Sequence, residues 1–340
     1  MDLDKKFVAI KLHFGERGNL AYLRSNYVKV VADQITSQGG LPFATDCSTL
    51  YVGFRKNGID HLETAALNGF NSISCGCPVI TGDGLKGTDD VELPVPNGIK
   101  VRTAKIGRTI CDADYMVTLT HFKGHMMTSF GGAIKNISMG CASRRGKMEM
   151  HVEEKPTVSD GCRGCRTCLK SCAEGAISMV GKKAVIDQDK CVGCGRCICD
   201  CRFDAISTVL SNGLAGVVDK MVEYTAAVCD AIPCFHISIV TDVSPGCDCD
   251  SRNDVPIIPN LGMFASFDPI ALDKACLDAC VAATPIAPDD MCVAEGNIFE
   301  RVNPGTDSSE EFRHAERIGF GSPEYELVKV KRCRSGHGTS

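Results

Sequence analysis

Cysteines are the residues of this chain best suited to do chemistry, and eight of them form a repeat. They are Cys162, Cys165, Cys168, Cys172, Cys191, Cys194, Cys197 and Cys201. Each half has the spacing C-x2-C-x2-C-x3-C, and the second half follows the first by 29 residues. The next residues, Ala176-Ile177-Ser178, return at the same shift as Ala205-Ile206-Ser207. The sequence therefore predicts two copies of one small unit whose thiolates are spaced as metal ligands.

The cysteine count indicates which chemistry these thiols perform. The chain has 22 cysteines in 340 residues, and its first six residues lead into a strand pattern without the apolar core of a signal peptide. We therefore expect a cytoplasmic protein, where thiols stay reduced and metal ligation is favoured over disulfides. Two tetrahedral zinc sites are the alternative, because C-x2-C pairs also suit zinc. Zinc binding, however, does not explain why the second x2 spacing and the x3 spacing also repeat in both halves.

The segment from Glu153 to Val209 resembles the two-cluster bacterial ferredoxin domain. In that arrangement three cysteines of a loop bind one [4Fe-4S] cluster, and the fourth binds the other cluster. The resemblance implies two [4Fe-4S] clusters as cofactors. The first would be held by Cys162, Cys165, Cys168 and Cys201. The second would be held by Cys191, Cys194, Cys197 and Cys172. The chain departs from the usual pattern at Ala173 and Arg202, where proline commonly follows the fourth cysteine.

Outside this segment, strand and helix patterns alternate. Strands are expected at 7–14, 41–45, 78–81, 115–120 and 235–240. Helices are expected at 20–39, 60–67, 106–112 and 216–229, and another should begin with Asp268 as N-cap and Pro269 in its first turn. Alternation predicts an α/β fold with a layered, mostly parallel sheet and a small inserted α+β ferredoxin-type domain. The expected divisions are 1–152 and 210–340 for the α/β domain and 153–209 for the insertion.

A group of histidines, lysines and glycines follows the strand at 115–120. Ligands of open α/β sheets bind beyond the carboxyl ends of strands, where a glycine-rich loop can bring N–H groups to an anion. Residues 121–141 are expected to form such a loop, and Asp46 could reach the same rim. An alternative is a simple turn with structural histidines. The predicted catalytic residues are His13, His121, Lys123, His125 and Lys135.

Further thiols lie outside the repeat. Cys247 and Cys249 form a C-x-C pair, as do Cys75 and Cys77, and Cys234 follows a proline. Soft thiolates of this kind could complete a third metal site, with Cys247 and Cys249 as its first candidates. The alternative is that they are reduced structural cysteines, which commonly pack as small hydrophobic side chains.

Several of these segments together are similar to a known family, the one catalogued as domain of unknown function 362. The similar segments are 11–16, 83–85, 121–141, 244–249 and 266–273. Members that carry an inserted ferredoxin module are similar to the whole chain. The resemblance implies a cytoplasmic iron–sulfur protein of anaerobic prokaryotes, and it implies no particular reaction.

Composition narrows the possible functions. The net charge is −5 without a concentrated basic segment, so nucleic acid is not an expected partner, and no apolar run is long enough to suggest a membrane partner. The sequence lacks G-x-G-x-x-G after its first strand and also lacks G-x-x-x-x-G-K-S/T. We therefore expect a reductase that receives electrons from a redox protein and acts on a small anionic substrate or cofactor. The alternatives are a metallocofactor assembly protein and a simple electron carrier.

Overall fold

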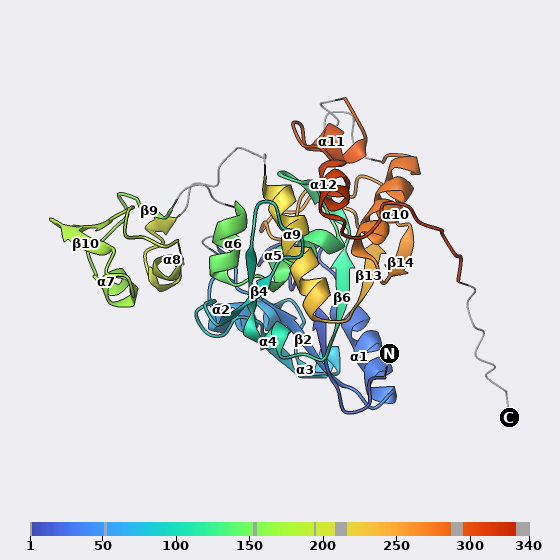
Figure 1. Ribbon diagram of the computed structural model, residues 1–340, viewed down its shortest axis with the longest axis horizontal. Helices are drawn as coiled ribbons and strands as arrows, with labels where there is room; N and C mark the ends of the chain where they lie inside the picture. The colour runs from blue at the N-terminus through green and yellow to red at the C-terminus, as the bar shows by residue number, and fades with distance from the viewer. Residues whose placement is uncertain are drawn as a thin grey trace.

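The structure is a computed structural model that describes residues 2–50, 53–151, 155–193, 195–207, 216–286 and 295–330. Its centre is a six-stranded sheet with the order β14-β13-β6-β1-β2-β3 (Figure 1). The strands are β1 (Phe7–Lys11), β2 (Leu41–Asp46), β3 (Val79–Thr81), β6 (Tyr115–His121), β13 (Cys234–Val240) and β14 (Gly262–Ser266). All neighbours pair in parallel except β13 and β14. The predicted α/β fold with a mostly parallel sheet is therefore confirmed.

Helices cover both faces of this sheet. Successive strand side chains point to opposite faces, so Val8 and Ile10 of β1 join one hydrophobic core and Ala9 joins the other. The face that carries Val8 packs against α1 (Ser25–Ser37). The other face packs against α5 (Ala133–Cys141), α9 (Val217–Ala231) and α10 (Pro269–Ala282). Burial on both faces agrees with the high apolar and β-branched content of the inner strands.

The remaining helices and two hairpins surround this centre. The helices are α2 (Gly58–Leu67), α3 (Ser72–Cys75), α4 (Arg108–Cys111), α6 (Arg144–His151), α11 (Ile298–Val302) and α12 (Glu310–Ile318). The hairpins pair β4 (Asp90–Pro94) with β5 (Thr103–Gly107) and β7 (Lys123–His125) with β8 (Ser129–Gly131). No helix in these described ranges combines the length and the apolar character that crossing a membrane requires.

The helix expected from residue 20 begins only at Ser25, and two expectations for residues 106–141 are also wrong. The stretch 121–141 is a short hairpin followed by α5, and it is not a glycine-rich loop. The N–H groups of Ala133 and Ile134 at the start of α5 donate to the carboxylate of Asp273, at 2.7 and 2.9 Å, so this helix end already holds an anion of the protein. The helix expected at 106–112 is also shorter, because Ile106 belongs to β5.

The cysteine segment, residues 155–207, contains a structural repeat. Its elements are β9 (Thr157–Val158), α7 (Thr167–Ser171), β10 (Ile177–Val180), β11 (Lys183–Ile186), α8 (Arg196–Asp200) and β12 (Ile206–Ser207). Helices α7 and α8 are related by the 29-residue shift of the sequence and pack against each other. In Figure 1 the segment extends from the α6 side of the molecule, with α8 nearer to α6 than β10 is. The predicted boundaries at 152/153 and 209/210 lie outside the described residues.

Helix α10 begins as predicted, with Asp268 as its N-cap. One carboxylate oxygen accepts from the N–H of Ile270 at 2.8 Å and of Ala271 at 3.3 Å, and the other accepts from Ser322. We expect Asp268→Ala to lower the free energy of unfolding by about 1 kcal/mol, since helix donors lose their acceptor. Denaturant titration measures this change.

The matched control for this cap variant is Asp33→Ala, which removes an exposed pair with Lys29 on α1. Its expected cost is about 0.3–0.5 kcal/mol, the worth of a surface pair one helical turn apart. Equal effects of the two substitutions would contradict the capping argument.

Candidate functional site

A cavity of about 710 Å³ lies at the carboxyl edge of the parallel sheet. Strands β1, β2, β6 and β13 all end at this edge, and each of them or the loop that follows it contributes lining residues, such as His13, Asp46, His121 and Cys247. The order of the strands reverses between β1 and β6, and the crevice at such a switch point is where open α/β sheets bind ligands. The fold therefore places a cavity at the edge of the sheet where the sequence predicts a ligand site.

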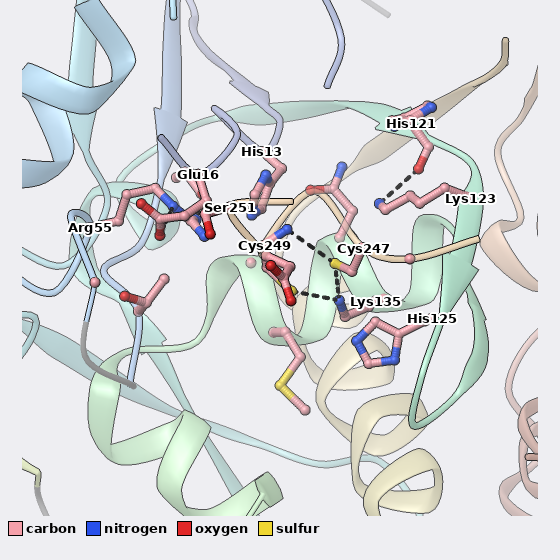
Figure 2. A pocket seen from close by; sticks show the side chains of 18 of the residues that line it. His13, Glu16, Arg55, His121, Lys123, His125, Lys135, Cys247, Cys249 and Ser251 are labelled. Carbon is pink, nitrogen blue, oxygen red and sulfur yellow. Dashed lines mark hydrogen bonds and ion pairs between the residues drawn. The ribbon is translucent and has the colours of Figure 1, made fainter. Parts of the chain in front are cut away.

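The structure brings the five predicted catalytic residues to this cavity, together with Cys247 and Cys249 (Figure 2). His13 follows β1, His121 ends β6, Lys123 and His125 belong to β7, and Lys135 lies on α5. Asp46 also lines the cavity, as expected.

His121 anchors the loop that carries the two cysteines. Its Nδ1 lies 2.9 Å from a carboxylate oxygen of Asp248, and its Nε2 lies 2.9 Å from the carbonyl oxygen of Thr241. Both partners are acceptors, so the two ring nitrogens tie His121 to the Asp248 carboxylate and to the backbone of Thr241. Burial alone would raise the pKa of Asp248, but the charges of His121 and Lys123 hold it at about 2. The Lys123 ammonium also donates to the His121 carbonyl at 2.8 Å. In this structure His121 therefore positions the loop between Cys247 and Cys249.

His13 and His125 differ from His121, because the Nδ1 atom of each accepts hydrogen bonds from the backbone and Nε2 is left to face the cavity. Nδ1 of His125 accepts from the N–H groups of Met127 and Thr128 at 3.1 and 3.2 Å, and Nδ1 of His13 accepts from Gly15 at 3.0 Å. The neutral rings therefore carry their proton on Nε2. Burial lowers the pKa of both histidines, helped by Arg55 near His13 and Lys135 near His125. Both are neutral hydrogen-bond donors at neutral pH.

Lys135 makes Cys247 the reactive thiol of the pair. The Lys135 Nζ lies 2.8 Å from the Cys247 Sγ and 4.0 Å from the Cys249 Sγ. A hydrogen bond from Cys249 and the charge of Lys135 lower the pKa of Cys247 well below its usual value, although burial acts in the opposite direction. The pKa of Cys249 is raised, because this thiol is hydrogen-bonded to Cys247 and buried. Burial would lower the pKa of Lys135, but the two sulfurs raise it. These shifts leave a Cys247 thiolate beside a Lys135 ammonium.

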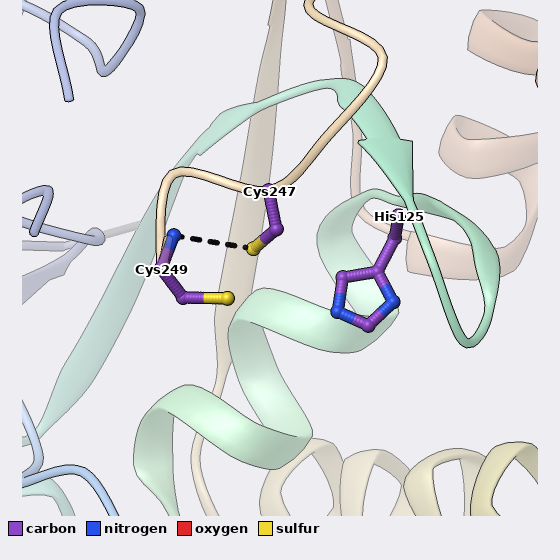
Figure 3. Close-up of side chains that lie close together, drawn as sticks. All are labelled: His125, Cys247 and Cys249. Carbon is purple, nitrogen blue, oxygen red and sulfur yellow. Dashed lines mark hydrogen bonds between the residues drawn. The ribbon is translucent and has the colours of Figure 1, made fainter. Parts of the chain in front are cut away.

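The same thiols form the group predicted as a third metal site. Ligand atoms of His125, Cys247 and Cys249 lie within 4.8 Å of one another (Figure 3). This grouping is compatible with metal binding. To ligate through Nε2, however, the neutral His125 ring would have to give up the two backbone hydrogen bonds at Nδ1. As folded here, His125 is set to donate to a thiolate.

The other extra thiols lie elsewhere. Cys75 and Cys77 are buried in the core beneath α1, and Cys234 lies beside Cys229 and His236. Neither group joins Cys247 and Cys249.

Sequence reasoning missed several charged residues of the cavity. Lys147 and His151 come from α6, a helix that is absent from those expected from the sequence. Their spacing with Arg144 at three- and four-residue intervals was the signal of a helix face. Lys147 is buried, its ammonium donates to the carbonyl of Ala142 at 2.6 Å, and burial lowers its pKa. Lys11 was a second signal of the site in the sequence, since a lysine inside an apolar strand needs a negatively charged or hydrogen-bonding partner when it is buried. It lies 2.9 Å from Asp46.

The cysteine segment gathers the first predicted ligand set. Cys162, Cys165, Cys168 and Cys201 line one small cavity of about 20 Å³. In equivalent places of the two copies, the N–H of Ala176 donates to Cys172 Sγ and that of Ala205 to Cys201 Sγ, both at 3.3 Å.

Of the second set, Cys172, Cys191 and Cys197 pack in the same hydrophobic cluster, and Cys194 lies outside the described residues.

The two cysteine loops have the same backbone shape. Gly164 and Gly193 have φ of 67° and 70°, and Arg166 and Gly195 have φ of 63° and 67°. These left-handed positions are related by the 29-residue shift, and Arg166 occupies one of them without the freedom of a glycine. The second loop packs on the α/β domain so closely that a Cβ on Gly195 would lie 2.9 Å from the Arg144 side chain.

The lysine–thiolate pair can be tested by alkylation at different pH values. We expect Cys247 to react with iodoacetamide well below the ordinary thiol pKa of about 8.5, because a lowered pKa leaves thiolate present at neutral pH. Lys135→Met should shift this reactivity to higher pH and slow labelling at pH 7 by roughly tenfold or more, as expected for a change of one pKa unit. Peptide mass spectrometry resolves the labelled site.

Cys111 is the internal control for this labelling, since burial raises its pKa to about 11 and it should label slowly in both chains. Equal Cys247 labelling with and without Lys135 would contradict the pairing.

Comparison with known proteins gives a family and distant structural likenesses. No curated protein matches the sequence. The lactate racemase apoprotein from Thermoanaerobacterium thermosaccharolyticum is similar over 83% of this chain and 50% of its own, at 13% identity and a TM-score of 0.41. A structural-genomics protein from Thermotoga maritima is similar over 81% of this chain and 54% of its own, at 11% identity and a TM-score of 0.38. This chain thus spans about half the length of both.

The sequence itself matches a family over residues 8–278, which include the sheet, the cavity and the cysteine segment. The chain belongs to the family described as Domain of unknown function (DUF362).

Proposed function

We propose that this protein is an iron–sulfur redox protein whose two [4Fe-4S] clusters pass electrons to a small anionic substrate or cofactor in the cavity. The position of Leu50 carries the proposal. This side chain lines the cavity and also packs in one hydrophobic cluster with Cys168 and Cys197 of the cysteine segment. A group bound by those cysteines would therefore be separated from the cavity by little protein.

The cysteine segment fits such clusters in three respects. The spacing is that of two-cluster ferredoxins, and the first ligand set lines one small cavity in the crossed combination expected for it. Backbone N–H groups point at ligand sulfurs in both copies, as they do around iron–sulfur clusters, where they tune the potential. Clusters of this kind supply electrons one at a time, and an external redox protein would load them.

The cavity residues would hold the anion and supply a proton. The cavity pairs Lys11 with Asp46 and Arg55 with Glu16. Lys123, Lys135 and Lys147 add further positive charge to its wall, which suits an anionic ligand. His13 offers an Nε2–H donor to an oxygen atom of that ligand, whereas the Nε2–H of His125 faces the Cys247 thiolate. Lys147 is the preferred proton donor, because burial brings its pKa closer to neutral pH.

Assembly of a metallocofactor is the second candidate function. It is favoured by the grouping of His125, Cys247 and Cys249, which could take up a thiophilic metal after the hydrogen bonds at His125 rearrange. In that case the clusters would sense or supply electrons for maturation of another protein.

Anaerobic purification of the full chain tests the proposal. We expect about eight irons and eight sulfides per chain and, after dithionite, paramagnetic spectra of two coupled clusters. Mass spectrometry of released small molecules should find an acidic compound in the parent chain that is lost in Lys147→Met.

Lys29→Met is the control variant, because Lys29 is exposed on α1 and pairs only one turn away with Asp33. Zinc without inorganic sulfide would contradict the cluster assignment. A third metal lost from Cys247→Ser, with no bound acid, would favour assembly.

A further inference from the structure

A second group of soft ligands lies at the opposite edge of the sheet from the cavity. Cys229 is in the last turns of α9, and Cys234 and His236 are at the amino end of β13. Residues two apart on a strand share a face, so Cys234 and His236 point to the same side. Their ligand atoms and the Cys229 sulfur lie within 4.8 Å of one another. None of the three lines the large cavity.

His236 is oriented as a metal-binding histidine would be. The strand register places it opposite Thr118 of β6, and its Nδ1 lies 2.9 Å from the Thr118 hydroxyl. Its Nε2 is buried, has no nitrogen or oxygen partner among the described residues, and faces the Cys229 sulfur. An unpaired buried ring nitrogen is costly, whereas a ligating histidine commonly has its second nitrogen held in this way.

We propose that Cys229, Cys234 and His236 form a zinc site with a fourth position left for water or a small ligand. Two thiolates and a neutral imidazole balance the charge of a divalent ion and are the donors that zinc prefers. Tetrahedral zinc needs donor atoms about 3.5–3.8 Å apart, a distance derived from its usual bond lengths, so small side-chain rotations complete the site. Both thiols are only partly buried, which gives the ion access. Binding forms two Zn–S bonds and one Zn–N bond and releases the two thiol protons to solvent.

A disulfide between Cys229 and Cys234 is the competing use of these residues. It would leave the Nε2 of His236 without a partner, so the histidine favours the metal. Sequence inspection missed the group because Cys229 belongs to a helix pattern and His236 to a strand pattern.

Zinc K-edge X-ray absorption of the anaerobically purified full chain, saturated with zinc and washed with a weak chelator, tests the site. We expect about one zinc per chain with two sulfur ligands and one nitrogen ligand plus a further light atom. All-sulfur coordination would place the zinc in the cysteine segment and overturn the proposal. This readout is independent of whether the iron–sulfur proposal holds. Because His125, Cys247 and Cys249 offer zinc the same donor atoms, substitutions decide which of the two groups binds it.

Substitutions of the proposed ligands test whether these residues bind the zinc ion. Cys229→Ser and His236→Gln should each lose the bound zinc, and Thr118→Val should weaken its affinity by about 10–100-fold, since Thr118 orients the ligand. Cys111→Ser is the matched control, because Cys111 is also half-buried but lies outside the group, and it should retain zinc. Retention of the same zinc spectrum by Cys229→Ser and His236→Gln, or a Cys229–Cys234 disulfide in the zinc-treated chain, would overturn the proposal.

Discussion

Cys201→Ala is expected to remove about four of the roughly eight irons, and the lost cluster should be the one held by the first cysteine loop. Cys201 belongs to the second copy of the repeat, yet it lines one small cavity with Cys162, Cys165 and Cys168 of the first copy. From this geometry we expect crossed ligation. Without its fourth thiolate the first cluster loses a charged ligand that alanine cannot replace, whereas the second cluster keeps all four of its predicted ligands.

Iron and sulfide analysis with low-temperature paramagnetic resonance measures this result. The interaction between two reduced clusters should vanish, and the simple signal of one cluster should remain. Cys172→Ala should give the reciprocal loss, and Cys111→Ala, outside the segment, should change neither iron nor spectrum. Loss of the second-loop cluster in Cys201→Ala would show that each copy binds its own cluster, which would contradict the crossed arrangement.

The four inner strands of the central sheet could be predicted because they are largely buried on both faces, whereas the partly exposed edge strand β14 was not predicted. β6 and β13 are rich in apolar and β-branched residues, and Asp268 followed by Pro269 marks the start of α10 in the sequence. The duplicated cysteine spacing likewise predicts the structural repeat of α7 and α8, since the same local sequence produces the same loop and helix.

Helices α5 and α6 were missed because polar and glycine residues conceal their buried faces. Ile134, Ile137 and Cys141 recur at helical spacing, but Gly131 and Gly132 just before them suggest a loop. In α6 the buried face contains Arg144 and Lys147, which a hydrophobicity pattern counts as exposed. The helix periodicity was present in both segments, but the glycines before α5 and the charged side chains on the buried face of α6 concealed it.

The pairing of distant site residues could not be predicted from local patterns. Lys135 meets Cys247 only because β6 and β13 are neighbours in the sheet, which brings α5 and the loop after β13 to one edge. His125 reaches the same sulfurs from a hairpin that has three residues per strand. Sequence can indicate that each strand end contributes to a site, whereas contact between particular side chains depends on strand order.

Lys11→Met is expected to lower the free energy of unfolding by about 3 kcal/mol, because it leaves a charged carboxylate buried without its closest cation. Lys11 is fully buried, and its ammonium lies 2.9 Å from Asp46 and 2.8 Å from the amide oxygen of Asn136. Asp46 keeps weaker partners, Arg55 at 3.8 Å and His61 at 3.6 Å, so the loss should fall at the lower end of the range for broken buried pairs. Denaturant unfolding at pH 7 measures it.

The pH dependence of this loss identifies its cause. Burial would raise the pKa of Asp46, but Lys11 and His61 hold it well below the usual value of 3.8. A lowered pKa stabilises the fold above the ordinary value and loses that contribution as pH falls through the folded value. Lys11→Met should therefore be most costly at neutral pH, and its deficit should shrink as the pH falls below about 4.

Adding Asp46→Asn to Lys11→Met should recover part of the lost stability, because neither charge is then buried alone. If the two substitutions are additive and the deficit is the same at every pH, the Lys11–Asp46 pair does not set the stability of this edge of the sheet.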